Sequence, residues 1–140
     1  MKDRLMTTVI TVALSDIAVE DVTCADVSVA HDAYLEDQSP ENVEKLSRHI
    51  AENLLKFAAD PESFGHDPGE HRRLRGMKSV TVLGVRAGME TIHVNSELSD
   101  GAGGTIEMPF ILHAMDGYRV VPTHDWVSER YCSSLGSQAL

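Results

Sequence analysis

The chain has 140 residues, of which 42% are hydrophobic and 24% charged, so it can bury one core but not two. Twelve basic residues against 22 acidic ones give a formal net charge of −10, which excludes nucleic acid as an expected partner. No run approaches the about 18 apolar residues that a membrane span needs, so we expect no membrane partner. The start of the chain resembles a signal peptide, but polar residues interrupt its apolar run, and we predict a cytoplasmic protein.

The segment 1–38 is predicted to be rich in strand. Met6 to Leu14 alternates and is dense in β-branched residues, which favours a strand. The next stretch, Ile17 to Leu35, fits two patterns, because its apolar residues both alternate and keep a helical spacing. For this stretch we predict a strand followed by a turn.

The segment 39–60, "SPENVEKLSRHIAENLLKFAAD", is the clearest helix. Ser39 can cap its N-terminus, Pro40 suits the first helical position, and Pro61 ends it. Its apolar residues form a single stripe, which must be buried against the rest of the chain. The stripe consists of Val43, Leu46, Ile50, Leu54 and Phe57.

The rest of the chain is predicted to be a polar loop over 61–77, an antiparallel sheet over 78–131 and a tail over 132–140. The last two strands are separated by Asp116 and Gly117, the strongest short hairpin signal in the sequence. The predicted strands are Ser79 to Arg86, Met89 to Leu98, Thr105 to Met115 and Tyr118 to Val127.

A two-residue turn at Asp116 and Gly117 would place Met115 opposite Tyr118 and fix the register of the hairpin. Because side chains alternate along a strand, one face is then mostly aliphatic and suits the helix, while the outer face is mixed. The aliphatic face takes Ile106, Met108, Phe110, Leu112 and Ala114, with Arg119, Val121, Thr123, Asp125 and Val127. The outer face takes Glu107, Pro109, Ile111, His113 and Met115, with Tyr118, Val120, Pro122, His124 and Trp126, and His93 from the preceding strand.

These elements predict one α+β domain over 1–140, in which a curved antiparallel sheet of four to six strands packs against one long helix. A striped helix, a polar loop and a final hairpin reading "HAMDGYRVVPTHDW" resemble the nuclear transport factor 2-like (cystatin-like) superfamily, over about the last two thirds of the chain. The chain departs from that pattern at its N-terminus, where the family usually begins with helices. The resemblance implies a roll with a cone-shaped pocket on its helix-covered face and dimerisation through its outer face. The family contains isomerases, dehydratases and epoxide hydrolases, and many members with no known catalysis.

Two surfaces of the hairpin are candidate binding sites. A pocket for a small apolar ligand would be lined by Met108, Phe110, Leu112, Val121 and Thr123. A homodimer or protein interface would use the large apolar side chains of the outer face, since such anchors are typical of interface centres. These anchors are Trp126, Val120, Ile111 and Met115.

Asp125 is the leading candidate for catalysis. Burial on the aliphatic face would raise its pKa and prepare it for general acid or base work at neutral pH, with Tyr118, His113 and His124 in support. The alternative is a carboxylate at the rim of the sheet, paired with a basic residue or with water.

No motif predicts a metal or a cofactor. The run "HDPGEH" (66–71) lacks the spacing of a zinc-binding helix and is better interpreted as a solvated loop. Gly101 to Gly104 is not followed by a helix, so it is not a phosphate-binding loop. Cys24 and Cys132 match no metal or redox spacing, which favours two separate buried residues, with a disulfide as the alternative.

The sequence therefore predicts a non-catalytic binding module that holds a small apolar ligand or a protein partner. The alternative is a lyase, isomerase or hydrolase that acts on a small molecule and uses Asp125 as general acid or base.

Overall fold

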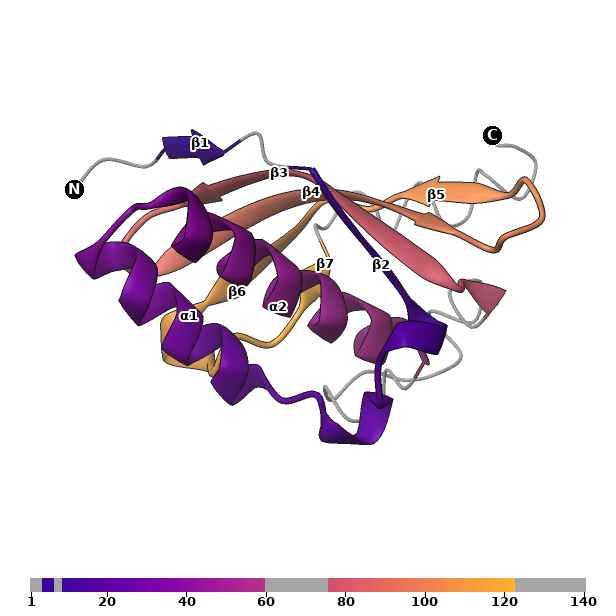
Figure 1. Cartoon of the computed structure of the whole chain (residues 1–140), viewed down its shortest axis with the longest axis horizontal. Coiled ribbons are helices and arrows are strands. Elements are labelled where there is room, and N and C mark those ends of the chain that lie inside the picture. Colours follow the sequence, from indigo (N-terminus) through magenta and orange to yellow (C-terminus); the bar gives the residue numbers. More distant parts are fainter. Residues whose placement is uncertain (1–3, 7–8, 60–75, 123–140) are drawn as a thin grey trace.

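The computed structural model describes residues 4–6, 9–59 and 76–122, and it shows an α+β fold with an antiparallel sheet and two helices on one side of it (Figure 1). The predicted α+β class with an antiparallel sheet is thereby confirmed. The helices are α1 (Cys24–Glu36) and α2 (Pro40–Ala59). Short 3-10 turns are η1 (Leu14–Asp16), η2 (Val19–Asp21) and η5 (Ala114–Asp116). The strands are β1 (Arg4–Met6), β2 (Ile10–Ala13), β3 (Ser79–Ala87), β4 (Thr91–Ser99), β5 (Thr105–Glu107), β6 (Phe110–His113) and β7 (Val121–Pro122).

The seven strands fill five positions in the sheet. Both β1 and β2 pair with β3, which pairs with β4; β4 pairs with both β5 and β6, and β6 pairs with β7. Every pairing is antiparallel, as expected for strands joined by short turns. The two long central strands, β3 and β4, therefore form the frame on which the shorter ones assemble.

Helix α2 has the predicted bounds and the predicted cap. The Ser39 Oγ accepts a hydrogen bond from the Asn42 N–H at 3.3 Å, which satisfies one of the free amides of the first turn. Four residues of the predicted stripe, Leu46, Ile50, Leu54 and Phe57, are fully buried, and Val43 packs at the edge of the same core. The local signals for this helix were sufficient because its period and its cap agree.

The prediction of a strand and a turn within Ile17 to Leu35 is wrong, because the chain forms α1 there. With α1 the described residues contain two helices, so the prediction of a single helix is wrong as well. The buried side chains of α1 are at positions i, i+3, i+4 and i+7, a helical stripe hidden by the polar character of its third member. They are Val27, Ala30, His31 and Tyr34. Packing of this stripe, partly against α2, selects the helix over the strand.

The predicted two-residue turn at Asp116 and Gly117 is also wrong. The chain forms η5 there, Gly117 is left-handed with a φ of 72°, and Tyr118 also has a positive φ of 63°. The longer turn moves the register by one residue, so that Ile111 lies opposite Val121 and not opposite Pro122. A slip of one residue exchanges the faces of a strand.

This slip changes the second half of the hairpin. Val120, predicted on the outer face, is completely buried in the core, and Tyr118 is 93% buried, being only 7% exposed. The first half keeps the predicted faces, because Phe110 and Leu112 are buried while His113 is exposed. Of the predicted fourth strand, Val121 and Pro122 form β7, and the residues from 123 onward lie outside the described part of the chain.

Most of the predicted loop 61–77 and all of the predicted tail 132–140 also lie outside the described residues, as does "HDPGEH". Neither α1 nor α2, the two helices within the described ranges, combines the length and the apolar composition needed to cross a membrane.

Candidate functional site

The helices cover one face of the sheet (Figure 1). The opposite, outer face carries a mixed set of side chains among the described residues. His93, Glu107 and His113 are exposed there and Ile111 is half-buried, as the sequence predicted. The pairing of His93 with Ile111 shows that these two residues are neighbours across β4 and β6. This face is therefore where the described residues offer polar groups beside apolar ones.

A β-bulge shapes the middle of β3. The register with β4 shifts between Val82 and Gly84, which leaves Leu83 as the extra residue. Before the bulge, Val80 and Val82 point into the core, and after it Val85 and Ala87 do. The bulge thus keeps the apolar residues of β3 inside although their spacing changes from even to odd.

A proline interrupts the strand on the other side of β4. β5 and β6 pair with β4 in one continuous register, but Met108 and Pro109 between them belong to neither strand. Pro109 has no N–H to donate to a ladder. The interruption is bridged at Ser96, whose carbonyl accepts from the Met108 N–H at 2.8 Å and whose Oγ donates to the Met108 carbonyl at 2.7 Å.

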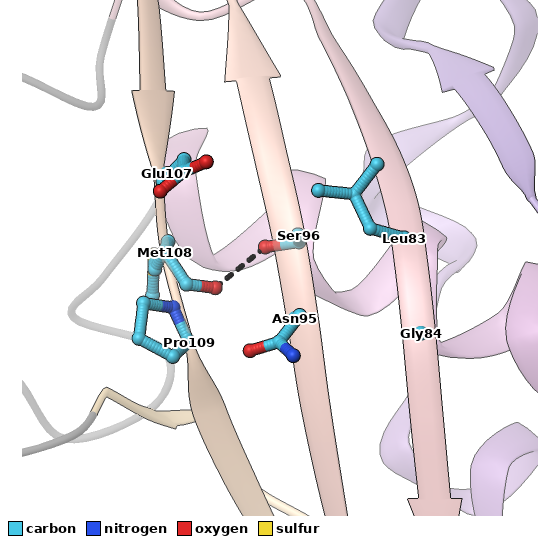
Figure 2. A pocket seen from close by; sticks show the side chains of 7 residues that line it. All are labelled: Leu83, Gly84, Asn95, Ser96, Glu107, Met108 and Pro109. Atoms are coloured by element: carbon cyan, nitrogen blue, oxygen red, sulfur yellow. Dashed lines mark hydrogen bonds between the residues drawn. The ribbon is translucent and has the colours of Figure 1, made fainter. Parts of the chain in front are cut away.

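The bulge and the break flank a hollow in the outer face, with a volume of about 430 Å³ (Figure 2). Gly84 pairs with Asn95, and by continuing the register of β4 Asn95 faces Pro109, so these three short residues form one row across the sheet. The rows on either side carry longer side chains on β4 and on the strand beyond it, and Arg86 adds a third in one of these rows. The hollow exists because a row of short side chains lies between two rows of long ones. It is lined by Leu83, Gly84, Asn95, Ser96, Glu107, Met108 and Pro109.

A second hollow of about 140 Å³ continues the first toward the other end of β4. Gly84, Asn95 and Pro109 line both, so the two form one trough along β4. The second hollow adds three longer side chains of the neighbouring row, Arg86, His93 and Ile111.

The trough offers the groups of a binding site. The Asn95 amide can donate and accept hydrogen bonds, Glu107 supplies a carboxylate and Arg86 a permanent positive charge. Within the described ranges, no group of three or more His, Cys, Asp or Glu side chains is placed to hold a metal ion. The side chains that line the trough offer hydrogen bonds, charge and apolar contact with Leu83 and Pro109.

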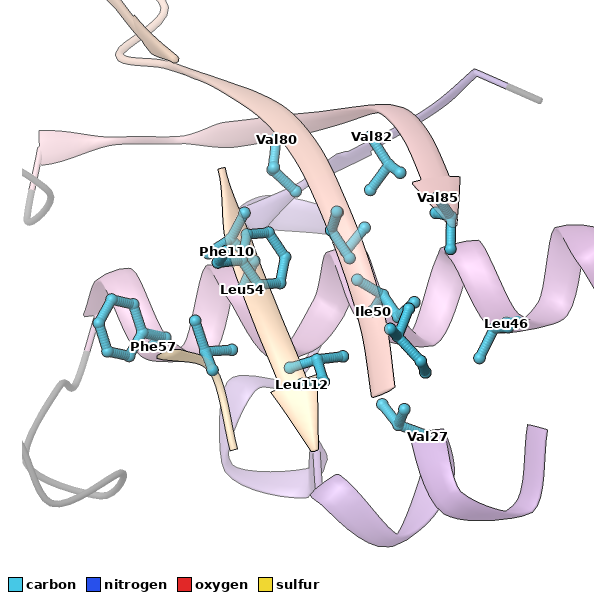
Figure 3. Close-up of a cluster of buried hydrophobic side chains, with 14 of the residues drawn as sticks. Val27, Leu46, Ile50, Leu54, Phe57, Val80, Val82, Val85, Phe110 and Leu112 are labelled. Atoms are coloured by element: carbon cyan, nitrogen blue, oxygen red, sulfur yellow. The ribbon is translucent and has the colours of Figure 1, made fainter. Parts of the chain in front are cut away.

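The residues predicted to line a ligand pocket are mostly packed in the core, although Met108 also borders the trough. Met108, Phe110 and Leu112 are at most 1% exposed and belong to the hydrophobic core, and Phe110 and Leu112 lie among side chains of α2 and β3 (Figure 3). Val121 is half-buried, and Thr123 lies outside the described residues. The inner face is thus filled by packed side chains at the positions where the sequence predicted the lining of a ligand pocket.

Tyr118, one of the four predicted catalytic residues, is held by α1. Its hydroxyl is 2.8 Å from Nδ1 of the fully buried His31, and Nε2 of that ring is 2.8 Å from the Gly88 carbonyl oxygen. Because the carbonyl can only accept, Nε2 carries a proton, and in the neutral ring Nδ1 accepts the phenol proton. The rings meet edge to face with centroids 5.6 Å apart.

The electrostatics of Tyr118 fit a structural clamp. Burial raises the pKa of the Tyr118 phenol above its ordinary value of 10.0, and repulsion from Asp32 adds to the rise, while a hydrogen bond from Ser28 acts in the opposite direction. A phenol that resists ionisation is a poor general base at neutral pH. His31 and Tyr118 together fasten α1 to the segment between β6 and β7.

The other predicted catalytic and interface residues are dispersed. His113 is exposed on the outer face, whereas Tyr118 is buried, and His124 and Asp125 lie outside the described residues. Among the interface residues, Met115 is 91% exposed at the tip of η5, Ile111 borders the trough, Val120 is in the core, and Trp126 lies outside the described part.

Cys24 is a free thiol at the start of α1, half-buried, and burial raises the pKa of that thiol although the positive charges of Lys56 and Arg119 act to lower it. Its possible partner in the sequence, Cys132, lies outside the described residues.

The sequence interpretation missed Leu83, Gly84 and Asn95. Two signals could have found them: the change of apolar phase at Gly84, which is typical of a bulge, and a proline within the strand predicted from Thr105 to Met115. Their coincidence across one central strand needed the register, which neither signal supplies.

Comparison of the chain with family models, with curated proteins and with solved structures finds no match, so the resemblance to the nuclear transport factor 2-like superfamily stays a prediction.

Proposed function

We propose that this chain is a non-catalytic binding module whose ligand lies in the trough on the outer face of the sheet. The observation that supports the proposal is the hollow of about 430 Å³ at Gly84, Asn95 and Pro109, between a bulge in β3 and a break between β5 and β6. Its volume falls within the range of about 300–1,000 Å³ that small-ligand sites occupy. Interruptions of regular pairing are concentrated next to functional sites, since they re-aim side chains and backbone groups.

The packing of the two faces supports this location over the one expected from the sequence. A ligand on the inner side would have to displace Phe110 and Leu112 from contact with α2, whereas the trough is already open. The roll geometry, the homodimer and the enzymatic alternative that depends on Asp125 stay predictions.

The proposal is tested by titrating the ¹⁵N-labelled full chain with a library of small carboxylates, amines and amides. We expect the amide resonances of Leu83, Asn95 and Glu107 to shift, and those of Leu46 and Leu54 in α2 to stay in place. The distinction follows from the position of the trough, which is separated from the core by the sheet itself.

Filling the trough tests the proposal further, and a second variant on the same face serves as the matched control. Asn95→Phe places a large, strand-compatible side chain in the floor of the hollow, while Thr105→Phe adds the same side chain to β5 on the same face outside it. Binding should be lost in the first variant and kept in the second. Equal binding by both variants, or no shift at the trough with any compound, would contradict the proposal.

A further inference from the structure

The two ends of the trough carry opposite charges. At one end, Arg86 and His93 lie opposite each other on β3 and β4, and both are exposed. At the other end, Glu107 of β5 lines the trough, and Glu97 lies opposite it on β4, outside the lining. The trough is therefore dipolar along β4, with the Asn95 amide between its ends.

These charged side chains form no ion pair with another described residue. None of the three ion pairs that the structure describes includes Arg86, Glu97 or Glu107. Two carboxylates directly opposite in a ladder repel each other, which costs stability relative to an unlike pair. A cationic group placed beside Glu107 and Glu97 would offset that repulsion. An anionic group placed beside Arg86 would form an ion pair with its guanidinium.

The spacing of the charges is that of an extended peptide. Arg86 and Glu107 pair with positions 93 and 97 of β4, which are four residues apart, or about 13 Å at the rise of a strand. An extended peptide laid along β4 presents its residues i and i+4 on one face at the same separation. The trough spans β3, β4 and β6, about two strand spacings or roughly 10 Å, which accommodates one extended chain.

The middle of the trough suits a peptide backbone. A primary amide such as Asn95 can donate to a peptide carbonyl and accept from a peptide N–H at the same time. Leu83, which is 41% exposed, and Pro109 supply apolar contact beside it. A short zwitterion would reach one charged end and leave the other empty.

We propose that the trough binds an extended peptide segment that carries a basic and an acidic side chain four residues apart. The basic side chain lies against Glu107, and the acidic one lies against Arg86 and His93. This inference rests on the proposed function, because it names the ligand class of the same site.

The test compares short peptides of identical composition. Acetyl-Lys-Thr-Val-Thr-Glu-amide and its reversed sequence, which cover both chain directions, place the charges four residues apart, while acetyl-Lys-Glu-Thr-Val-Thr-amide places them side by side. All three are electrically neutral, so the net charge of −10 on the protein does not favour one over another. Binding is measured by ¹⁵N chemical-shift titration of the full chain, and we expect one of the first two peptides to bind about two- to fivefold more tightly than the third.

A charge exchange makes the test specific. Arg86→Glu should lower the affinity of the tighter-binding peptide by about two- to fivefold. A peptide with lysine at both ends should bind this variant more tightly than it binds the original chain. Lys45→Glu, on the exposed side of α2, makes the same change in net charge away from the trough and should leave the order of the peptides unchanged.

The outcomes separate this inference from the proposed function. Small compounds that shift the trough resonances, together with peptides that bind regardless of charge spacing or of Arg86→Glu, would overturn the peptide assignment and leave the binding module intact. An absence of shifts with both compounds and peptides would overturn both. A stable dimer in light scattering, together with shifts of the Arg86 and Asn95 amide resonances as the dimer forms, would assign the trough to a second copy of the chain. That result would also overturn the peptide assignment.

Discussion

The two faces of the sheet are built from the same strands, but the inner face is closely packed and the outer face contains an open trough. On the inner face, Ile92, Leu98 and Leu112 are completely buried, and they belong to the same hydrophobic core as the apolar stripe of α2. On the outer face, rows that carry charged and other polar side chains lie on both sides of the short row of Gly84, Asn95 and Pro109. The inner face therefore specifies the fold through its packing, whereas the irregularities on the outer face leave room for a ligand.

Adjacent residues of β6 offer the largest expected contrast between the faces. Leu112→Ala should lower the free energy of unfolding by about 2–5 kcal/mol, because it removes buried methyl groups and leaves a cavity. His113→Ala, one residue further and exposed, should change it by no more than about 0.5 kcal/mol. Urea unfolding followed by circular dichroism measures both values. Losses of similar size would show that the alternation of faces assigned to β6 is wrong.

A second pair of neighbours tests the break between β5 and β6. Ser96→Ala removes the buried hydroxyl that donates to the Met108 carbonyl and should cost about 1 kcal/mol of unfolding free energy. Asn95→Ala, on the outer face of the same strand, should leave stability within about 0.5 kcal/mol and abolish ligand binding instead. The two variants are compared by the same unfolding curves and by the chemical-shift titration. If Asn95→Ala were the more destabilising change, the trough would be a structural feature and not a binding site.

The smallest effect concerns Tyr118, which the register slip moves from the outer face to the inner one. Its pKa in the folded chain is raised above the ordinary value of 10.0, so the folded state holds the phenol proton more tightly than the unfolded state does. The contribution of this group to stability is therefore fully present below pH 10 and is lost as the pH rises through the folded pKa. Urea unfolding between about pH 9 and about pH 11 should show a shallower fall for Tyr118→Phe than for the original chain. Parallel curves for the two proteins would place Tyr118 in contact with solvent.

The candidate site could be predicted only in part. The outer positions of His93, Glu107, Ile111 and His113 follow from alternation within single strands, and the structure confirms them. The trough itself could not be predicted, because it requires Gly84 and Pro109 to be aligned with Asn95 on two sides of β4. That alignment is a property of pairing between strands distant in the sequence.

The sequence by itself determined α2 and the inner residues of β4 and β6, because helix capping and side-chain periodicity act within a few residues of the chain. Only the tertiary structure decided α1, the register of β7 and the burial of Tyr118. The physical reason is the same in each instance: two local conformations were nearly equivalent, and the one that buried His31, Tyr118 and Val120 in the shared core prevailed.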